Sequence, residues 1–361
     1  MVFMSLLIVL LGCNTSKSNQ NSSLESTTFK DMSTLSTYPI EELSDNIQES
    51  FIGNRFVLGL GTIGNDGSIL LGNVPIDETE DSILYLHNVE DGSDIELDRV
   101  KANMHFGYNY QDDEIIVYFR HRVWSAYAIP EEYYIYHKDT QLIEPMNVDD
   151  TIDFYQLMMI DRRMVRMGQD LYFEIQDREP IYEEDSEYYQ DNGSSIYKYN
   201  LDTKEISFVI RGMSPRIYNG ELIYINNSQE AKIMTMNGTE ILDRVVDYYA
   251  YDDVLIAVQY INEGTCKMTL IKNGIKETIF DRTYNDMFWN AYTNGDFVTW
   301  LQGGSYDLLC FYDIERKSLV TISSLPGGST TISEKYLHWS ENLDPDDKFN
   351  GEMVIHYIKF D

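Results

Sequence analysis

One unit of sequence recurs along this chain and limits what the chain can fold into. Its shortest copy is IYNGELIYINNSQEAKIMTMNGTEILDR, residues 217–244. Asn219-Gly220 and Asn237-Gly238 are hairpin signals, because both central residues of a type I′ turn need positive φ, which Asn and Gly accept most easily. The runs beside these turns are rich in β-forming residues: Glu221–Ile225, Ile233–Met236 and Glu240–Asp243. The unit therefore predicts short antiparallel strands joined by tight turns.

Two kinds of hairpin alternate along the chain. The inner hairpin is a polar turn followed by an apolar run, and it occurs as NDGSILLG (65–72), QDDEIIVYF (111–119), GQDLYFEI (168–175), NGELIYI (219–225), YDDVLIAVQY (251–260), NGDFVTWL (294–301) and SEKYLHW (333–339). The outer hairpin is a strand, an Asp, Asn or Gly turn and a second strand, as in KIMTMNGTEIL. Its last copy, MVIHYIKFD, has one strand only. Each copy of the unit therefore supplies four short strands.

This repeat predicts an all-β fold, a seven-bladed β-propeller over residues 47–361. A single four-stranded blade cannot bury both faces until neighbouring blades pack on it. Six or eight blades are the alternative counts, and a β-sandwich would use similar strands without needing seven hairpin pairs in phase. Because the last copy lacks an outermost strand, we expect a segment near Phe51–Leu60 to pair there and close the ring.

The chain begins with an apolar stretch, MVFMSLLIVLLGC, that is too short to span a bilayer as a helix. We interpret residues 1–12 as a signal peptide. Leu10-Leu11-Gly12-Cys13 resembles the bacterial lipobox, and the resemblance implies cleavage after Gly12 and a lipid on Cys13. The stretch departs from the usual pattern because no Lys or Arg precedes it, which an upstream start or an atypical signal would explain. The alternative is a buried cysteine after an ordinary apolar segment.

Residues 13–46 are expected to form a flexible tether, because a Ser, Thr and Asn rich segment with few large apolar side chains cannot offset the entropy of ordering. Together with the lipobox, this predicts an extracytoplasmic protein, lipid-anchored at the bacterial cell surface and monomeric. The net charge of −33 excludes nucleic acid as a main partner and disfavours contact with an anionic membrane beyond the lipid itself. Cys266 and Cys310 fall in third strands of neighbouring copies, and we expect two buried thiols there.

Loop lengths predict where a ligand binds. The turns within hairpins are short, whereas the connections from second to third strands vary, and varied loops on a regular scaffold usually carry function. Aromatic and Arg side chains dominate binding hot spots. The candidates on this face are Arg122, Trp124, Tyr127, Tyr188 and Tyr189, and near the axis Trp289. Chance is the alternative, because the chain has 28 tyrosines, and packing explains Trp289 equally well.

The longest connection, Gln176–Ser195, carries seven acidic residues and one arginine. Clustered carboxylates could hold Ca²⁺, which takes six to eight oxygen ligands, but the spacing does not match the DxDxDG calcium loop. A solvated acidic loop is the favoured interpretation, and protein contact is a further alternative. The weak metal candidates are Glu183, Glu184, Asp185 and Glu187. We expect no other cofactor.

The sequence lacks a GxSxG elbow, a GxxxxGK[ST] phosphate loop and a GxGxxG before a helix, so we lean against an enzyme. Copies such as IYKYNLDTKEI (196–206), with an Asp-Thr-Lys turn between strands, resemble TolB-like propellers and Gram-positive surface lipoproteins built on such repeats. That resemblance implies an architecture and a general binding or scaffold role. We therefore expect the propeller to bind a protein or glycan through its loop-rich face. A polysaccharide-acting lyase or hydrolase and a structural envelope scaffold are the alternatives.

Overall fold

The computed structural model describes residues 36–37, 46–58, 61–73, 80–101, 104–122, 130–146, 148, 164–178, 181–182, 189–191, 193–228, 230–262, 265–283, 288–302, 308–322, 330–343 and 352–360. Every regular element among these residues is a β-strand. Within the same ranges there is no helix long and apolar enough to cross a membrane.

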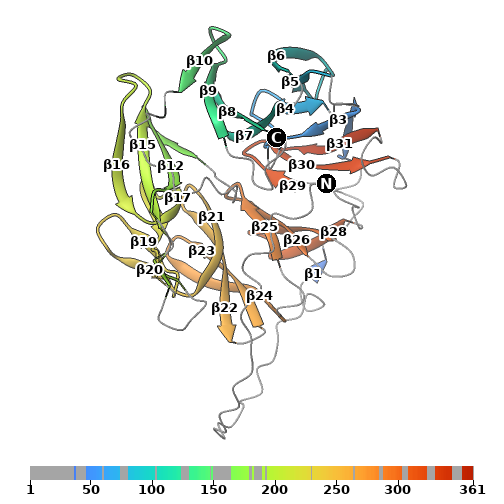
Figure 1. Ribbon diagram of the computed structural model, residues 1–361. Helices are drawn as coiled ribbons and strands as arrows, with labels where there is room; N and C mark the ends of the chain where they lie inside the picture. Colours follow the sequence, from blue (N-terminus) through green and yellow to red (C-terminus); the bar gives the residue numbers. More distant parts are fainter. Residues whose placement is uncertain are drawn as a thin grey trace, which may run out of the picture.

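The strands form a seven-bladed β-propeller, in which each blade is an antiparallel sheet and the blades fan around one axis (Figure 1). From the third blade to the seventh, the first strands of neighbouring blades contact one another, so the first strands lie innermost. Blade 1 consists of β3 (Arg55–Val57), β4 (Ser68–Asn73), β5 (Ser82–Asn88) and β6 (Asp94–Val100). Blade 2 consists of β7 (Met104–Gln111), β8 (Ile115–Arg122), β9 (Pro130–His137) and β10 (Leu142–Met146). Blade 3 consists of β11 (Val165–Met167), β12 (Asp170–Gln176), β15 (Ser194–Asn200) and β16 (Ile206–Arg211).

The other four blades repeat this arrangement. Blade 4 consists of β17 (Met213–Tyr218), β18 (Glu221–Ile225), β19 (Ile233–Thr235) and β20 (Glu240–Leu242). Blade 5 consists of β21 (Val245–Tyr251), β22 (Val254–Asn262), β23 (Thr265–Lys272) and β24 (Ile275–Thr283). Blade 6 consists of β25 (Phe288–Thr293), β26 (Phe297–Gln302), β27 (Leu308–Asp313) and β28 (Ser318–Ile322). Blade 7 consists of β29 (Thr330–Ile332), β30 (Tyr336–Asn342), β31 (Met353–Lys359) and β2 (Gln48–Gly53). Two additions lie outside this pattern: β1 (Ser36–Thr37), parallel to β28, and the hairpin of β13 (Ile181–Tyr182) and β14 (Tyr189–Asp191).

The core is divided among the interfaces between blades. The buried apolar side chains of the described residues form seven clusters, and each cluster joins one blade to the next. Trp300 and Cys310 of blade 6, for example, pack with Ile256 and Cys266 of blade 5. Both cysteines are buried free thiols, as the sequence predicted. A blade has an apolar surface on both faces, so it is stable only between two neighbours.

The ring closes between blades 7 and 1. Strand β2, from the N-terminal side of the domain, pairs antiparallel with β31 and completes blade 7. The predicted closure is therefore confirmed, but the closing strand begins earlier, at Gln48, and shares only residues 51–53 with the predicted segment, because Arg55–Val57 already forms the innermost strand of blade 1. Glu90 of blade 1 accepts hydrogen bonds from Tyr336 and Lys359 of blade 7, which ties the two ends of the chain together.

The tight turns follow the sequence signals that predicted them. Asn219 and Gly220, between β17 and β18, have φ values of 52° and 72°, as a type I′ turn requires. The two residues between β23 and β24, Asn273 and Gly274, have φ values of 53° and 72°. The positive φ at these turns therefore explains why Asn-Gly pairs occur there.

His338 is buried at the closure of the ring. It lies on β30 with no exposed surface, and its Nδ1 is 3.2 Å from Oγ1 of Thr331. The same Thr331 hydroxyl donates a hydrogen bond to the carbonyl of Gly61, which precedes β4 of blade 1. Burial lowers the pKa of His338 from 6.5 to about 3, although a hydrogen bond with the Gly61 backbone acts in the opposite direction. His338 is therefore neutral in the folded protein at any pH well above 3.

This burial predicts a pH-dependent stability. Between pH 6.5 and about 3 the unfolded chain protonates His338 and the folded chain does not, so the free energy of unfolding falls as the pH falls. His338→Gln removes this group. Between pH 6 and 4.5, unfolding by denaturant should show a dependence about 1 kcal/mol per pH unit steeper in the wild type than in the variant. The lowered pKa of His105 contributes to the pH dependence of both proteins and therefore does not account for a difference between them. Equal slopes in the wild type and the variant would contradict the assignment of His338 as a buried, neutral histidine.

Candidate functional site

Among the residues that the sequence predicted to bind a ligand or a metal, the structure describes the backbone of three and the side chain of none. Arg122, Tyr189 and Trp289 fall in strands β8, β14 and β25, where the backbone is described and these side chains are not. The other candidates lie outside the described residues: Cys13, Trp124, Tyr127, Glu183, Glu184, Asp185, Glu187 and Tyr188. These assignments therefore remain predictions.

The two faces of the propeller differ as the sequence predicted. On one face, hairpin turns such as residues 219–220, 252–253 and 273–274 join strands directly. The connection between β3 and β4, residues 58–67, is longer than these turns. On the other face, the connections from second to third strands run from residues 263–264 in blade 5 to residues 177–193 in blade 3, which contain the β13–β14 hairpin. We call this second face the loop-rich face.

The base of the acidic insert in blade 3 is held by a polar network. Nη1 of Arg178 donates to Oδ1 of Asp177 and to the hydroxyl of Ser195, each at 2.7 Å. The hydroxyl of Tyr197 donates to Oδ2 of Asp177 at 2.8 Å. Burial and this hydrogen bond raise the pKa of Tyr197 to about 12, so the hydroxyl stays protonated and continues to donate. The insert therefore begins and ends on a fixed platform, and Asp177 and Arg178 serve this structural role.

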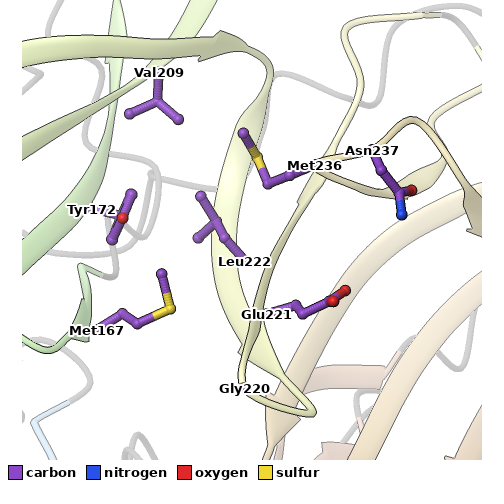
Figure 2. Close-up of a pocket in the computed structure, with 8 residues that line it drawn as sticks. All are labelled: Met167, Tyr172, Val209, Gly220, Glu221, Leu222, Met236 and Asn237. Atoms are coloured by element: carbon purple, nitrogen blue, oxygen red, sulfur yellow. The ribbon is translucent and has the colours of Figure 1, made fainter.

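A pocket of about 330 Å³ opens on the opposite face, between blades 3 and 4 (Figure 2). It lies beside the hairpin turns, because its walls include Gly220 between β17 and β18 and Asn237 between β19 and β20. The complete lining is Met167, Tyr172, Val209, Gly220, Glu221, Leu222, Met236 and Asn237. Its volume is at the lower end of the range for small-ligand sites.

The chemistry of this pocket is mainly apolar. Figure 2 shows the side chains of Met167, Val209 and Leu222 around the cavity, and Glu221 and Tyr172 are the ionisable residues in the lining. Burial raises the pKa of Tyr172, so it is neutral at physiological pH. The pocket can accept an apolar group but does not bring an acid and a base together. Sequence analysis missed it, because the cavity is formed by two blades and no motif marks it.

A Ser-His-Asp arrangement spans blades 7 and 1. The Ser50 hydroxyl on β2 lies 2.8 Å from Nε2 of His87 on β5, and Nδ1 of His87 lies 2.8 Å from Oδ1 of Asp94 on β6. Because Nδ1–H donates to the carboxylate, Nε2 accepts from the Ser50 hydroxyl. Burial alone would raise the pKa of Asp94, but hydrogen bonds from Arg55 and His87 hold it below its ordinary value. This is the hydrogen-bond order of a catalytic triad.

The surroundings of these three residues assign them a structural role. Ser50 is 5% exposed and His87 has no exposed surface, so the hydroxyl is enclosed between the blades. The hydrogen bonds join the closing strand β2 to the third and fourth strands of blade 1. They give both nitrogens of the buried His87 imidazole a hydrogen-bond partner where blade 7 meets blade 1. Sequence analysis missed this contact because Ser50 and His87 are 37 residues apart and share no motif.

Comparison with known proteins identifies the fold. No family model and no curated protein matches the sequence. A prolyl endopeptidase structure is similar, with a TM-score of 0.56 and 10% identity over 91% of this chain and 53% of that one. The chain thus spans about half the length of that protein. Oligogalacturonate lyase from Vibrio parahaemolyticus has a TM-score of 0.52 and 11% identity over 86% of this chain and 91% of that one. These likenesses show a β-propeller and not an activity.

TolB from Acinetobacter baumannii is also among the similar structures. Its TM-score is 0.40, with 10% identity over 80% of each chain.

The structural role of Ser50 can be tested by removing its hydroxyl. Ser50→Ala leaves Nε2 of buried His87 without its partner and should lower the free energy of unfolding by about 1–3 kcal/mol. Ser207→Ala is the control, because Ser207 is exposed on the outermost strand of blade 3, and it should change stability by less than about 0.5 kcal/mol. Denaturant unfolding measures both. Labelling of Ser50 by a fluorophosphonate in the folded protein would contradict the assignment, because it would show a reactive and accessible hydroxyl.

Proposed function

We propose that this chain is a lipid-anchored extracellular β-propeller that binds a protein or a glycan through its loop-rich face. The observation that supports this most strongly is the difference between the two faces. Second-to-third-strand connections vary from residues 263–264 to residues 177–193, whereas many hairpin turns are two residues long. The blades are otherwise regular, and the blade 3 insert starts from a fixed polar base. Recognition loops on a rigid scaffold are arranged in this way.

Two connections on this face carry the residue types that anchor ligands. Arg122 is the last residue of β8, and Trp124 and Tyr127 belong to the connection between β8 and β9. Tyr188 and Tyr189 belong to the insert in the next blade. Indole, phenol and guanidinium groups combine large contact areas with polar tips, so they suit a sugar ring or a peptide. We propose these side chains, with Trp124 at the centre, as the binding surface.

The anchor is the second part of the proposal. It rests on Leu10-Leu11-Gly12-Cys13 and on the tether, residues 13–46, which would separate the domain from the membrane. A chain with a net charge of −33 would be repelled by an anionic membrane surface, so the lipid would be the membrane contact. Incorporation of a labelled fatty acid at Cys13 is the measurement that tests it.

Truncation of the central indole tests the binding surface. Binding of the protein to glycan and peptide arrays should fall by about tenfold or more in Trp124→Ala, because a hot-spot side chain contributes about 2 kcal/mol. Its thermal unfolding should be unchanged. Met236→Ala, on the opposite face, is the matched control and should bind as the parent does.

Two results would count against the proposed role. Unchanged binding in Trp124→Ala and in variants of every other insert would show that the loop-rich face is not the binding surface. Cleavage of a polysaccharide on incubation with the protein would instead indicate the alternative function, a polysaccharide-acting lyase or hydrolase.

A further inference from the structure

Arg216 is a buried cation without a counter-ion among the residues that the structure describes. It lies on β17, the innermost strand of blade 4, and is 4% exposed. Its Nη1 donates to the carbonyl of Pro215 at 2.7 Å, whereas its Nε has no hydrogen-bond partner. No carboxylate of the described residues forms an ion pair with it. Burial of an unpaired charge is unfavourable, and this chain has 60 acidic residues against 27 basic ones from which to draw a partner.

The guanidinium lies toward the axis of the propeller. Its Cζ is 5.7 Å from the ring centroids of both Tyr248 and Tyr249, on the adjacent innermost strand β21 (Figure 1). Consecutive residues of a strand point to opposite faces of the sheet. A group near both rings must therefore lie across the inner edge of β21, because β22 occupies the outer edge. The two aromatic faces stabilise the positive charge but supply no hydrogen-bond acceptor in the plane of the guanidinium.

The backbone before Arg216 is irregular. The pairing of β17 with β18 shifts register between Met213 and Arg216, and Ser214 has a φ of 52°. Gly212 has a φ of 157°, and an added Cβ would lie 2.4 Å from Cδ2 of Tyr224. A β-bulge redirects the side chains that follow it, and such irregularities concentrate at functional sites. Arg216 is the first residue of β17 that pairs again with β18 after this irregularity.

Two other arginines show what the free edge of Arg216 can bind. Nε and Nη2 of Arg99 donate to the two oxygens of Glu96 at 2.9 and 2.8 Å. Nε and Nη2 of Arg120 donate to Asp98 at 3.0 and 2.8 Å. In Arg216 the third nitrogen, Nη1, is already engaged by Pro215, and no carboxylate of the described part of the chain binds this same Nε–Nη2 edge.

Carboxylates near this position are engaged elsewhere. Glu174 accepts hydrogen bonds from the Ser194 hydroxyl at 2.7 Å and from the Ser214 backbone N–H at 3.0 Å. Oδ1 of Asp247 accepts from the backbone N–H of Tyr248 at 2.8 Å. Both lie close enough to affect the ionisation of Tyr248, yet neither pairs with Arg216. The position opposite the free edge of Arg216 is therefore not filled by either neighbour.

We propose that Arg216 binds the carboxylate of a small ligand at the axis of the propeller, through the Nε–Nη2 edge and between the rings of Tyr248 and Tyr249. Planar, two-point recognition of a carboxylate is what an arginine edge supplies. This inference does not depend on the loop-rich face or on the lipid anchor. A failure of the Trp124 experiment would therefore leave it intact, and its own failure would leave the proposed function intact.

Titration of the full chain with small carboxylates tests the site. Acetate, D-glucuronate and N-acetylglycine should raise the thermal unfolding temperature in a concentration-dependent way, because a ligand that binds the folded state stabilises it. Neutral D-glucose and N-acetylglycinamide should not. Comparison of glucuronate with N-acetylglycine distinguishes an acidic sugar from an acylated amino acid as the source of the carboxylate.

The matched variants are Arg216→Met and Arg120→Met. Arg216→Met should weaken carboxylate binding by about tenfold or more and leave the unliganded unfolding temperature unchanged or higher, because it removes an unpaired buried charge. Arg120→Met breaks the pair with Asp98, so it should lower the unfolding temperature and keep the response to carboxylates. A loss of stability in Arg216→Met as large as that in Arg120→Met would show a structural arginine and overturn the proposal.

A measurement on the wild type keeps the test independent of the variants. In protein with ¹⁵N-labelled arginine, carboxylates should shift one buried Nε–H resonance downfield as the hydrogen bond forms. If no arginine Nε–H resonance responds and the unfolding temperature does not change with any of the three carboxylates, the proposal is wrong.

Discussion

The packing of each blade against two neighbours is the constraint on which the rest of this structure depends. Strands such as β22 and β26 are buried along most of their length, so the sheets that contain them are apolar on both faces. A four-stranded sheet of this kind has no stable state alone. Seven clusters of buried apolar side chains, one at each interface between blades, cover these faces. The cluster between blades 7 and 1 closes the propeller. Closure by β2 also removes the free edge that β31 would otherwise present.

The interface between blades 3 and 4 differs from the rest. Its buried cluster, Tyr172, Ile196, Leu222 and Tyr224, is the smallest of the seven among the described residues. The same two blades form the pocket lined by Met167 and Met236. The interfaces around Trp300 and Trp339 contain larger buried clusters, so the pocket lies where the buried apolar cluster is smallest.

Local sequence was sufficient to predict the blades. Asn219-Gly220 predicted a turn that the structure contains, and Cys266 and Cys310 are buried as their positions in third strands indicated. The closing strand was placed a few residues too late, because a β-rich run near a chain end does not show which of two blades it joins. Gln48–Gly53 and Arg55–Val57 are adjacent in sequence, yet they belong to blades 7 and 1.

The buried polar sites could not be predicted in this way. Ser50, His87 and Asp94 meet because the ring closes, and Arg216 meets Tyr248 and Tyr249 because β17 and β21 are adjacent inner strands. Each of these contacts depends on the relative placement of two blades, about which hairpin periodicity says nothing. Arg216 also follows an irregularity in the pairing of β17 with β18, and the strand pattern alone would give regular pairing there. Sequence reasoning therefore predicted the scaffold and left these sites to the three-dimensional structure.

Native-state hydrogen exchange, measured across a series of low denaturant concentrations, tests most directly whether the seven blades form one closed ring. A closed ring predicts that the amides of β2 and β31 exchange with the same free energy of opening as those of central strands such as β22, because no blade can leave without exposing both neighbours. Exchange of β2 and β31 at a much lower free energy, with the other blades still protected, would show an open ring and contradict the account.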